Sequence, residues 1–406
     1  MPGISLYRLP SSMTPVLPEK DGELRELATE LIKNSAKLTS AFNPITRRAI
    51  SGLIEPMNSY YSNLIEGHFT HPLEIEKALK KDYSKEPAKK LLQLESRAHV
   101  IVNHEMKKKL SSMNNAYSWE LISWLHKSFY EHLPEELRTI KTKNGNSITL
   151  TPGAIRTSEV EVGRHIAPAA ESLNEFISFF EDNYSRKKIA DPLKRIIAIA
   201  ASHHRLTWIH PFLDGNGRVV RLFSEAAAII ENVDGDGLWS ISRGLAVNNK
   251  EYYDALNNAD MKRWNDYDGH GNLSDKFLTE FCVFFLKTAI DQTNFMLSLL
   301  EPEKMTNRLK EFVNLMTIRS EMRKESIYLL EEAMFKGKVY KGDLERITGK
   351  SENVARSIMK NLIDEGLLIN ESEEFRSPVI INFPIKHAPY IFPKLFPKDV
   401  EATMKD

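Results

Sequence analysis

The residues from His210 to Arg221 place several chemically reactive groups within twelve positions: an imidazole, a carboxylate, a Gly-Asn-Gly turn and two guanidinium groups. His210 is a candidate general base, because the pKa of a histidine ring ordinarily lies close to neutral. Arg218 and Arg221 lie three positions apart, on one face of the helix that we expect after the turn. This set of groups is suited to binding, neutralising and attacking a polyphosphate.

The turn itself predicts a phosphate site. Gly215, Asn216 and Gly217 directly precede the helix expected over residues 218–230, so their backbone N–H groups can form an anion-binding concavity at a helix N-terminus. Asp214 is the acidic residue of this turn, and phosphates would repel its carboxylate unless a divalent cation lay between them. This argument favours Mg²⁺, which is commonly bound by a carboxylate together with substrate phosphates.

Helices must position this segment. Asp191 and Pro192 are suited to the cap and first turn of a helix that runs toward His210 with an apolar face. Earlier in the chain we expect helices over residues 22–43 and 46–66, with Pro56 bending or splitting the second and Gly67 ending it. Another helix is expected from Thr70 and Pro72 onward, two within 85–134, and further helices to about Leu300.

Two parts of the chain depart from the helical pattern. Residues 144–164 contain the turn signal Asn144-Gly145 and partly alternating apolar residues, which predicts a small hairpin. From Met322 onward the pattern predicts a helix, a short helix, a turn, a third helix and two strands, at 367–369 and 379–381. The expected fold is mainly α, divided into an N-terminal helical domain over 1–110, a central domain over 111–300 and a C-terminal α+β domain over 305–406.

Length and composition restrict the class of protein. The 406 residues are expected to form two or three domains, and 42% hydrophobic with 27% charged residues is ordinary for a globular protein. Lys+Arg and Asp+Glu both total 55, which argues against a basic surface that coats nucleic acid or membranes. The single cysteine, Cys282, is expected in the core. The first residues lack the apolar stretch of a signal peptide and no run reaches transmembrane length, so we expect a cytoplasmic protein without membrane contact.

Ser62 and Glu66 form a second group of interest. They lie four positions apart and therefore share a helix face. Glu66 falls in the last turn, where the helix dipole makes a carboxylate unfavourable by about 0.3–1 kcal/mol. A cationic partner from elsewhere in the chain would relieve this, although a solvated surface glutamate is the alternative.

The string from His210 to Arg218 resembles the signature of the Fic (filamentation-induced-by-cyclic-AMP) family, His-Pro-Phe-x-[Asp/Glu]-Gly-Asn-[Gly/Lys]-Arg, at every position. The resemblance implies a Fic-type helical core and a protein that transfers AMP from ATP to a Ser, Thr or Tyr hydroxyl of a target protein. It implies that His210 deprotonates this hydroxyl and that Asp214 holds Mg²⁺ between the α- and β-phosphates. Asn216 and the turn amides are then expected at the α-phosphate, and Arg218 at the β-phosphate.

The segment from Ser62 to Gly67 resembles the inhibitory motif of Fic proteins, [Ser/Thr]-x-x-x-Glu-[Gly/Asn], in the N-terminal position of class II. This resemblance implies that Glu66 pairs with Arg221, the guanidinium that would otherwise hold the γ-phosphate of ATP. AMP transfer is then suppressed in the resting protein. In some relatives this glutamate also supports removal of AMP from the target, and the sequence leaves that open.

Two further resemblances concern the substrates. Residues 152–163 resemble the Fic flap, a hairpin whose edge pairs with an extended target segment, with an ordinary connecting hairpin as the alternative. The residues expected to contact the target are Ser158, Glu159, Val160, Glu161 and Val162. The adenine is expected beside Tyr252, Tyr253 and Asn257, with core packing as the alternative for the aromatic residues.

The C-terminal pattern resembles a winged helix-turn-helix, which would allow DNA binding through its third helix. Lys350, Arg356 and Lys360 favour this slightly, but acidic residues on the same helix and in the expected wing oppose it, so we favour contact with a protein. The alternatives to AMP transfer are transfer of another nucleotide or of phosphate, and a DNA-binding regulator that senses nucleotide. The oligomeric state stays open, with a homodimer among the options.

Overall fold

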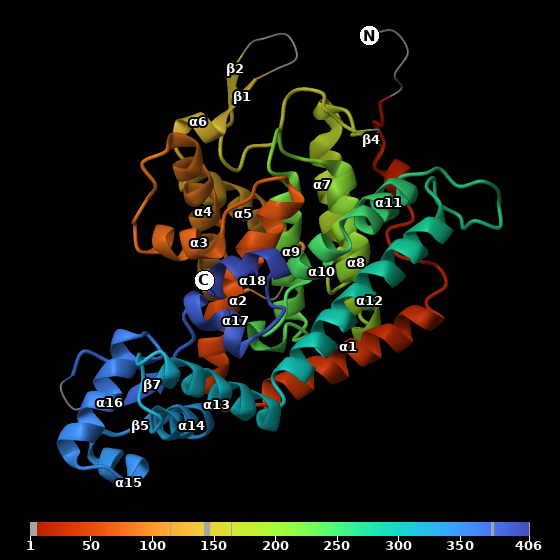
Figure 1. Cartoon of the computed structure of the whole chain (residues 1–406). Helices are drawn as coiled ribbons and strands as arrows, with labels where there is room; N and C mark the ends of the chain where they lie inside the picture. Colours follow the sequence, from red (N-terminus) through yellow and green to blue (C-terminus); the bar gives the residue numbers. More distant parts are fainter. Residues whose placement is uncertain (1–5, 114, 142–146, 164, 375–376, 406) are drawn as a thin grey trace.

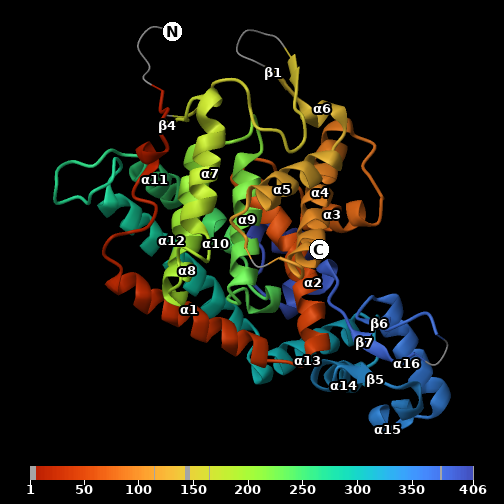
Figure 2. The ribbon, with the colours of Figure 1, turned by 180° about the vertical axis from the view of Figure 1, so that it is seen from behind.

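The computed structural model describes residues 6–113, 115–141, 147–163, 165–374 and 377–405. Helices form most of this structure, and the strands are short and lie in three small sheets (Figures 1 and 2). The predicted mainly α fold class is therefore confirmed. The division of the chain into three domains stays a prediction.

The N-terminal part contains α1 (Gly22–Ser40), α2 (Pro44–Ile65), α3 (Pro72–Leu79) and α4 (Pro87–Leu110). Asn43 caps α2, because its side chain accepts hydrogen bonds from the Ile45 and Thr46 backbone N–H groups. Pro56 lies inside α2, which continues through it as one helix. Gly67 follows the C-cap residue with a φ of 80°, as predicted for the residue that ends this helix.

The central part contains α5 (Trp119–Glu131), α6 (Glu135–Arg138), α7 (Leu173–Tyr184), α8 (Pro192–Ile209), α9 (Asn216–Ile230), α10 (Ile241–Val247), α11 (Asn249–Ala259) and α12 (Asp275–Leu299). Asp191 caps α8 by accepting a hydrogen bond from the Leu193 N–H, as its sequence position predicts. The helices α8 and α9 pack together in the middle of the molecule (Figure 1). The loop between them carries His210 and Asp214 and ends at Gly215, so Asn216 and Gly217 already belong to the first turn of α9, two residues before the expected start of this helix.

The strands of the central part differ from the single hairpin that we expect over residues 144–164. β1 (Thr139–Lys141) pairs antiparallel with β2 (Ser147–Thr149), and β3 (Glu161–Val162) pairs antiparallel with β4 (His165–Ile166). Two hairpins therefore flank the segment, and most of residues 150–160 between them is irregular. The predicted turn at 144–145 lies outside the described residues.

The C-terminal part contains α13 (Pro302–Ile318), α14 (Ser326–Lys336), β5 (Lys338–Val339), α15 (Leu344–Thr348), α16 (Glu352–Asp364), β6 (Leu368–Asn370), β7 (Val379–Ile381), α17 (Ala388–Ile391) and α18 (Lys398–Lys405). The sheet is antiparallel with the strand order β5-β7-β6. The helices and two strands expected from Met322 onward are present, while α13, β5, α17 and α18 are elements that the sequence pattern does not predict. The designation of this segment as a winged helix stays a prediction.

The helix α2, which carries Ser62, belongs to the same hydrophobic core as the C-terminal part. Buried residues of α2, including Leu53, Met57 and Tyr60, pack in one cluster with buried residues between Met296 and Met404. The Tyr61 hydroxyl also donates to the Leu395 backbone carbonyl at 3.0 Å. A second cluster joins α1 with α4 and the central helices. The helix α2 therefore contacts the central helices on one side and the C-terminal part on another.

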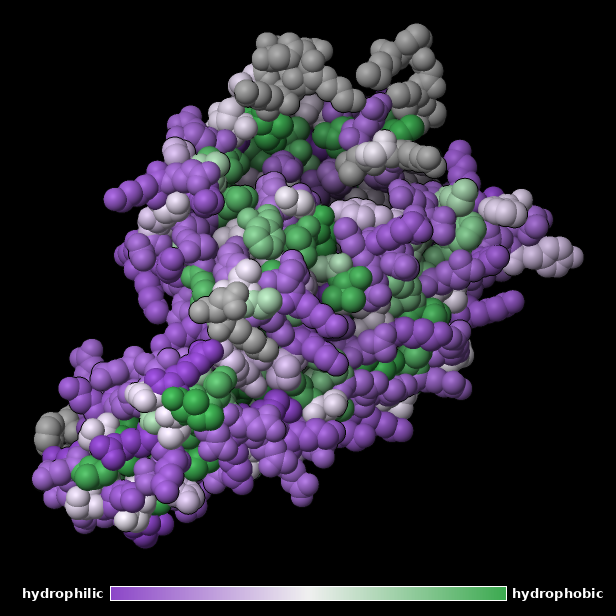
Figure 3. Space-filling view, in the orientation of Figure 1, coloured by the Kyte–Doolittle hydropathy of each residue, from purple (hydrophilic) through white to green (hydrophobic). Residues whose placement is uncertain are grey.

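The surface is mostly hydrophilic on the face shown in Figure 3, where the C-terminal lobe projects from the main body and carries a small hydrophobic patch. Among the helices that the structure describes, we find none with the length and apolar character needed to cross a membrane.

Candidate active site

His210 lies directly after α8, where its backbone adopts the left-handed conformation with a φ of 50°. This conformation, uncommon for a non-glycine residue, ends the helix and turns the chain toward the Gly-Asn-Gly turn. Burial, with further electrostatic contributions from His165 and Arg156, lowers the pKa of His210 to about 3. The ring is therefore neutral at physiological pH and able to accept a proton.

Asp214 is exposed next to the turn, and residues of α5 hold it in place. The hydroxyl of Tyr130, on α5, donates to Asp214 Oδ2 at 2.9 Å. His126, also on α5, accepts a hydrogen bond from the Gly153 N–H on Nδ1, so its Nε2 carries the proton that is donated to the Asp214 carbonyl at 3.3 Å. The helix α5 thus fixes both the side chain and the backbone of Asp214.

The turn delivers the N-terminus of α9 to the site. Gly215, with a φ of 76°, is the N-cap residue, and a Cβ there would lie 2.6 Å from the Tyr130 hydroxyl oxygen. The Asn216 side chain accepts from the Phe212 N–H at 3.0 Å and donates to the Phe212 carbonyl at 2.8 Å. Because this side chain is engaged within the loop, Asn216 can offer a phosphate its backbone N–H rather than its amide group.

Arg221 contacts both Ser62 and Glu66 directly. The Arg221 guanidinium donates from Nε to Ser62 Oγ at 2.9 Å. From Nη2 it donates to the Ser62 carbonyl at 2.9 Å and to Glu66 Oε1 at 2.6 Å. The Arg221 side chain is 1% exposed and that of Glu66 is 29% exposed. The structure therefore brings together the second arginine and both motif residues singled out in the sequence.

Glu66 also lies against the first turn of α9. A Cβ atom built on Gly217 would overlap Glu66 Oε1, so only glycine at this position leaves room for the carboxylate in its present place. Burial acts to raise the pKa of Glu66, but the charges of Arg221 and Arg218 outweigh it, and the pKa lies below its ordinary value. The unfavourable position at the end of α2 is thus compensated by two guanidinium groups and by the positive end of α9.

Arg218 has a carboxylate partner that its position in the sequence does not predict. Glu95, on α4, forms an ion pair with Arg218 Nη1, and both side chains are almost fully buried. The guanidinium also lies over the Phe129 ring, with its carbon 5.1 Å from the ring centre. Burial lowers the pKa of Arg218 to about 10, so the group remains a cation at neutral pH.

The sequence does carry a signal for Glu95. It continues the buried stripe of Ala98, Val102 and Met106 on α4, at helical spacings of three and four residues. A carboxylate on an apolar stripe requires a buried cationic partner, because an unpaired charge is costly to bury. The partner itself cannot be identified from spacing, since α4 and α9 are far apart in the chain.

Arg156 links residues 152–163, the segment that resembles the flap, to the His210 loop through hydrogen bonds. The buried Arg156 guanidinium donates to the His210 carbonyl at 2.8 Å, to the Ser158 carbonyl at 2.9 Å and to the Pro168 carbonyl at 2.6 Å. Ser158, Glu159 and Glu161 are exposed beside it, with Val160 half-buried. Val162 pairs with His165 in the β3–β4 hairpin. The role of these residues in target binding stays a prediction.

The three residues expected at the adenine are placed differently from one another. Tyr252 is buried, and its hydroxyl lies 2.8 Å from Nε2 of the buried His203, so it belongs to the core. Tyr253 and Asn257 are exposed one turn apart on α11, and the Tyr253 hydroxyl donates to the Ile65 carbonyl at 3.2 Å. This contact places Tyr253 next to the end of α2.

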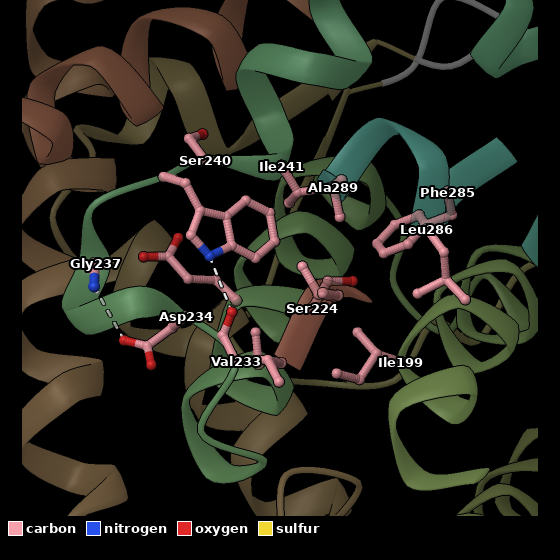
Figure 4. Close-up of a pocket in the computed structure, with 14 residues that line it drawn as sticks. Ile199, Ser224, Val233, Asp234, Gly237, Ser240, Ile241, Phe285, Leu286 and Ala289 are labelled. Carbon is pink, nitrogen blue, oxygen red and sulfur yellow. Dashed lines mark hydrogen bonds between the residues drawn. The ribbon is translucent and has the colours of Figure 1, made fainter. Parts of the chain in front are cut away.

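A cavity of about 30 Å³ lies behind α9, away from His210. Figure 4 shows its lining of apolar side chains such as Ile199, Phe285 and Leu286, with Asp234 bonded to the Gly237 N–H at one end. This volume is far below the roughly 300–1,000 Å³ of small-molecule pockets. The cavity is therefore a packing void rather than a small-molecule site.

No cluster of three or more histidine, cysteine or acidic residues within the described ranges could hold a metal ion. Asp214 is the acidic residue that the turn places at the mouth of the site, with its side chain 51% exposed.

Comparison with known proteins places this geometry in a family. The Fic/DOC family model matches residues 116–228, which run from just before α5 nearly to the end of α9. The protein adenylyltransferase Fic of Nematostella vectensis is 29% identical over 167 residues, covering 41% of this chain and 36% of that protein. The protein adenylyltransferase fic-1 of Caenorhabditis briggsae is 38% identical over 80 residues, covering 19% of this chain and 15% of that protein. The chain thus matches about a third or less of the length of these relatives.

Solved structures show the same fold at lower sequence identity. A Fic family protein from Desulfovibrio desulfuricans, 15% identical, aligns with a TM-score of 0.50 over 93% of this chain and 99% of its own. A Fic domain-containing signaling protein from Bacteroides thetaiotaomicron, 17% identical, aligns with a TM-score of 0.51 over 68% of this chain and 97% of its own. The family match, the relatives and the shared fold agree with the signature at His210–Arg218: residues 116–228 of the chain form a Fic/DOC family domain.

Proposed function

We propose that this protein is a protein adenylyltransferase that transfers AMP from ATP to a Ser, Thr or Tyr hydroxyl of a target protein, and that Glu66 holds it inactive. The observation that carries the proposal is the arrangement of a neutral, half-buried His210 and two arginines around the N-terminus of α9. The adenylyltransferase names of the matched relatives support the same reaction. The Fic/DOC family match over residues 116–228 contains His210, Arg218 and Arg221, whereas Glu66 lies outside it.

In this reaction the His210 ring accepts the proton of the target hydroxyl, whose oxygen attacks the α-phosphorus of ATP. The bond from the α-phosphorus to the bridging oxygen breaks, and pyrophosphate leaves. Backbone N–H groups of the first turn of α9 hold phosphate oxygens, because they have no partner within the helix. Arg218 neutralises the β-phosphate, and Arg221 neutralises the γ-phosphate once Glu66 has left it.

Asp214 is suited to holding Mg²⁺ against the phosphates. Its carboxylate is exposed toward the turn, and the Tyr130 hydroxyl fixes its orientation. One carboxylate is an adequate protein ligand, since Mg²⁺ is usually held by one or two carboxylates with phosphate and water oxygens. When bound, the ion would neutralise part of the negative charge of the phosphates.

Inhibition follows from the position of Glu66. Its carboxylate accepts a hydrogen bond from Arg221 and lies over Gly217, in the space where phosphate oxygens would meet the helix N-terminus. A negatively charged γ-phosphate would compete with Glu66 for the same guanidinium. ATP is then bound with its α-phosphate out of line for attack, and transfer is slow.

Incorporation of radiolabelled AMP from ATP into the proteins of a cell lysate tests the proposal. Glu66→Gly is expected to increase labelling strongly, and His210→Ala is expected to abolish it with or without Glu66. Glu365→Gly is the matched control, because Glu365 is likewise the C-cap residue of a helix followed by a glycine of positive φ, but lies on α16. Labelling that is unchanged by Glu66→Gly would contradict inhibition, and labelling that survives His210→Ala would contradict the reaction.

The alternatives predict different products. Transfer of UMP or of phosphate adds a different mass to the target than AMP, so mass spectrometry of the modified protein separates these reactions. Intact Asp214, Arg218 and Arg221 favour ordinary use of ATP. A DNA-binding regulator that only senses nucleotide would show steeply salt-dependent binding to duplex DNA without labelling from ATP.

A further inference from the structure

Two acidic side chains hold the two arginines of α9, and they hold them in different ways. Glu66 pairs with Arg221 from the C-cap position of α2, and its side chain is 29% exposed. Glu95 pairs with Arg218 from within the 24-residue helix α4, and its side chain is 3% exposed. A carboxylate at a helix end can be displaced by a ligand, whereas one inside a buried helix face cannot leave without unfolding its surroundings.

The orientation of Arg218 shows which part of the guanidinium is engaged. Nη1 pairs with Glu95, while Nη2 points toward the turn and lies 3.9 Å from Asp214 Oδ2. The Phe129 ring supports one face of the group. Glu95 therefore fixes one nitrogen of the guanidinium and leaves the other directed at the place where phosphates would lie.

Glu95 is itself held in place. His68, two residues after Glu66, has its Nδ1 2.6 Å from Glu95 Oε2. Burial, with Arg218 as the second cause, lowers the pKa of His68, so the ring is neutral and Nδ1 must donate to the carboxylate. One carboxylate thus accepts a hydrogen bond from His68 on one oxygen and forms the ion pair with Arg218 through the other, so it lies between the two groups.

We infer that Glu95 is a positioning residue for nucleotide binding: it acts through Arg218 to present one guanidinium nitrogen to the β-phosphate. The inference rests on the proposed function and deepens it, since it assigns opposite roles to two acids that each pair with an arginine. Removal of Glu66 releases Arg221 to the nucleotide. Removal of Glu95 lets the Arg218 side chain turn away and lowers the affinity for the nucleotide.

Calorimetric measurement of ADP and AMP binding to the whole chain tests the role of Glu95 directly. ADP carries the β-phosphate and lacks the γ-phosphate, so it does not compete with Glu66 for Arg221, while AMP carries neither the β- nor the γ-phosphate. Glu95→Gln, which keeps the size of the side chain and removes its charge, is expected to weaken ADP binding about tenfold, a loss in the range of one charged hydrogen bond. AMP binding is expected to be unchanged, and Glu86→Gln, at the exposed N-cap of α4, serves as the control.

Action through Arg218 requires that the two residues be coupled. Arg218→Ala is expected to weaken ADP binding at least as much as Glu95→Gln, and the double variant no more than Arg218→Ala alone. Glu95→Asp keeps the charge and is expected to lose less ADP affinity than Glu95→Gln. If a thermal melt shows that Glu95→Gln does not fold, the comparison of Glu95→Asp with wild type on ADP against AMP decides the question.

Several outcomes would overturn the inference. One is ADP affinity that Glu95→Gln leaves unchanged, and another is an equal loss for ADP and AMP, which would indicate general damage to the fold. A third is higher AMP transfer when Glu95→Gln is added to Glu66→Gly, which would make Glu95 a second inhibitory residue. A wild-type protein that binds neither nucleotide, together with an inactive Glu66→Gly variant, would overturn the proposed function itself, and this inference with it.

Discussion

Glu66 accepts a hydrogen bond of 2.6 Å from the Arg221 guanidinium while its carboxylate lies over Gly217, at the N-terminus of α9. One side chain thus occupies both features of the helix that would attract a phosphate, the cation and the exposed backbone N–H groups. Under the proposed function, a phosphate of ATP would need the groups that this contact occupies. The contact would then both stabilise the protein and compete with ATP.

Stability and activity should therefore change in opposite directions when Glu66 is replaced. The pKa of Glu66 is lowered in the folded protein, so its carboxylate contributes stability that is present above its ordinary value of 4.5 and is lost as the pH falls through the lower folded-state value. Glu66→Gln is expected to reduce the free energy of unfolding by about 2 kcal/mol at neutral pH. The difference from wild type should disappear in acid.

Urea denaturation at neutral pH and again below the pKa of Glu66 measures this difference. The variant Glu365→Gln provides a comparison, because Glu365 occupies the same local position on α16. A stability difference that persists unchanged into acid would mean that Glu66 stabilises the protein by something other than its charge.

Ser62 is expected to contribute a smaller part of the inhibition. Ser62→Ala removes the hydroxyl that accepts from Arg221 Nε, but the Ser62 carbonyl and Glu66 still hold Nη2. AMP transfer should rise about two- to fivefold, well below the effect of Glu66→Gly. Ser59→Ala is the matched control, because the Ser59 hydroxyl, one turn earlier on α2, donates to the Ser96 carbonyl of α4 instead of holding α9. Equal activation by both variants would indicate that loosening α2 is sufficient.

Tyr130 is expected to set the magnesium requirement. Tyr130→Phe removes the hydroxyl that donates to Asp214 Oδ2 and leaves the ring in place. The Mg²⁺ concentration that gives half-maximal transfer should rise about tenfold, as for other groups that orient a metal ligand. Tyr117→Phe tests the specificity of this effect, because the buried Tyr117 hydroxyl has no hydrogen-bond partner within the described part of the chain. An unchanged Mg²⁺ dependence in Tyr130→Phe would argue against Asp214 as the ligand or against its orientation by Tyr130.

The sequence predicts local features of this site well and long-range ones only through the family resemblance. Gly67 and Asp191 end and begin helices as their types predict, because caps depend on neighbouring residues. The contacts of Glu95 and Arg156 could not be predicted from the sequence, since each residue contacts a partner that tertiary packing brings near. Asn216 shows a further limit: its position in the turn suggests a phosphate ligand, yet its amide closes the loop against Phe212.

The pH profile of the reaction should reflect the surroundings of His210. Burial, with His165 and Arg156, lowers the pKa of His210 to about 3, so the ring stays unprotonated well below the pH at which an ordinary histidine gains its proton. The kcat/KM of Glu66→Gly is therefore expected to show no acidic limb near pH 6.5, because this parameter reports ionisations of the free enzyme. An acidic limb at the ordinary histidine value would mean that His210 is solvated in the active protein.

Arg156 is expected to link the flap-like segment to catalysis. Its guanidinium spans three carbonyls, of His210, Ser158 and Pro168, and a single ammonium group cannot reach all of them. Arg156→Lys should therefore lower kcat in the Glu66→Gly background about tenfold, through loss of two hydrogen bonds that hold the segment. ADP affinity should be unchanged, because the phosphate-binding groups belong to α9 and its turn.

Hydrogen exchange locates the effect of Arg156→Lys. The amides of residues 152–163 should exchange faster in the variant, while those of α9 keep their protection. Arg356→Lys, at an exposed position on α16, is the control for an arginine-to-lysine change without a buried role. A fall in kcat without faster exchange in 152–163 would place the effect at the His210 carbonyl alone, and the flap-like segment would then have no part in positioning the target hydroxyl.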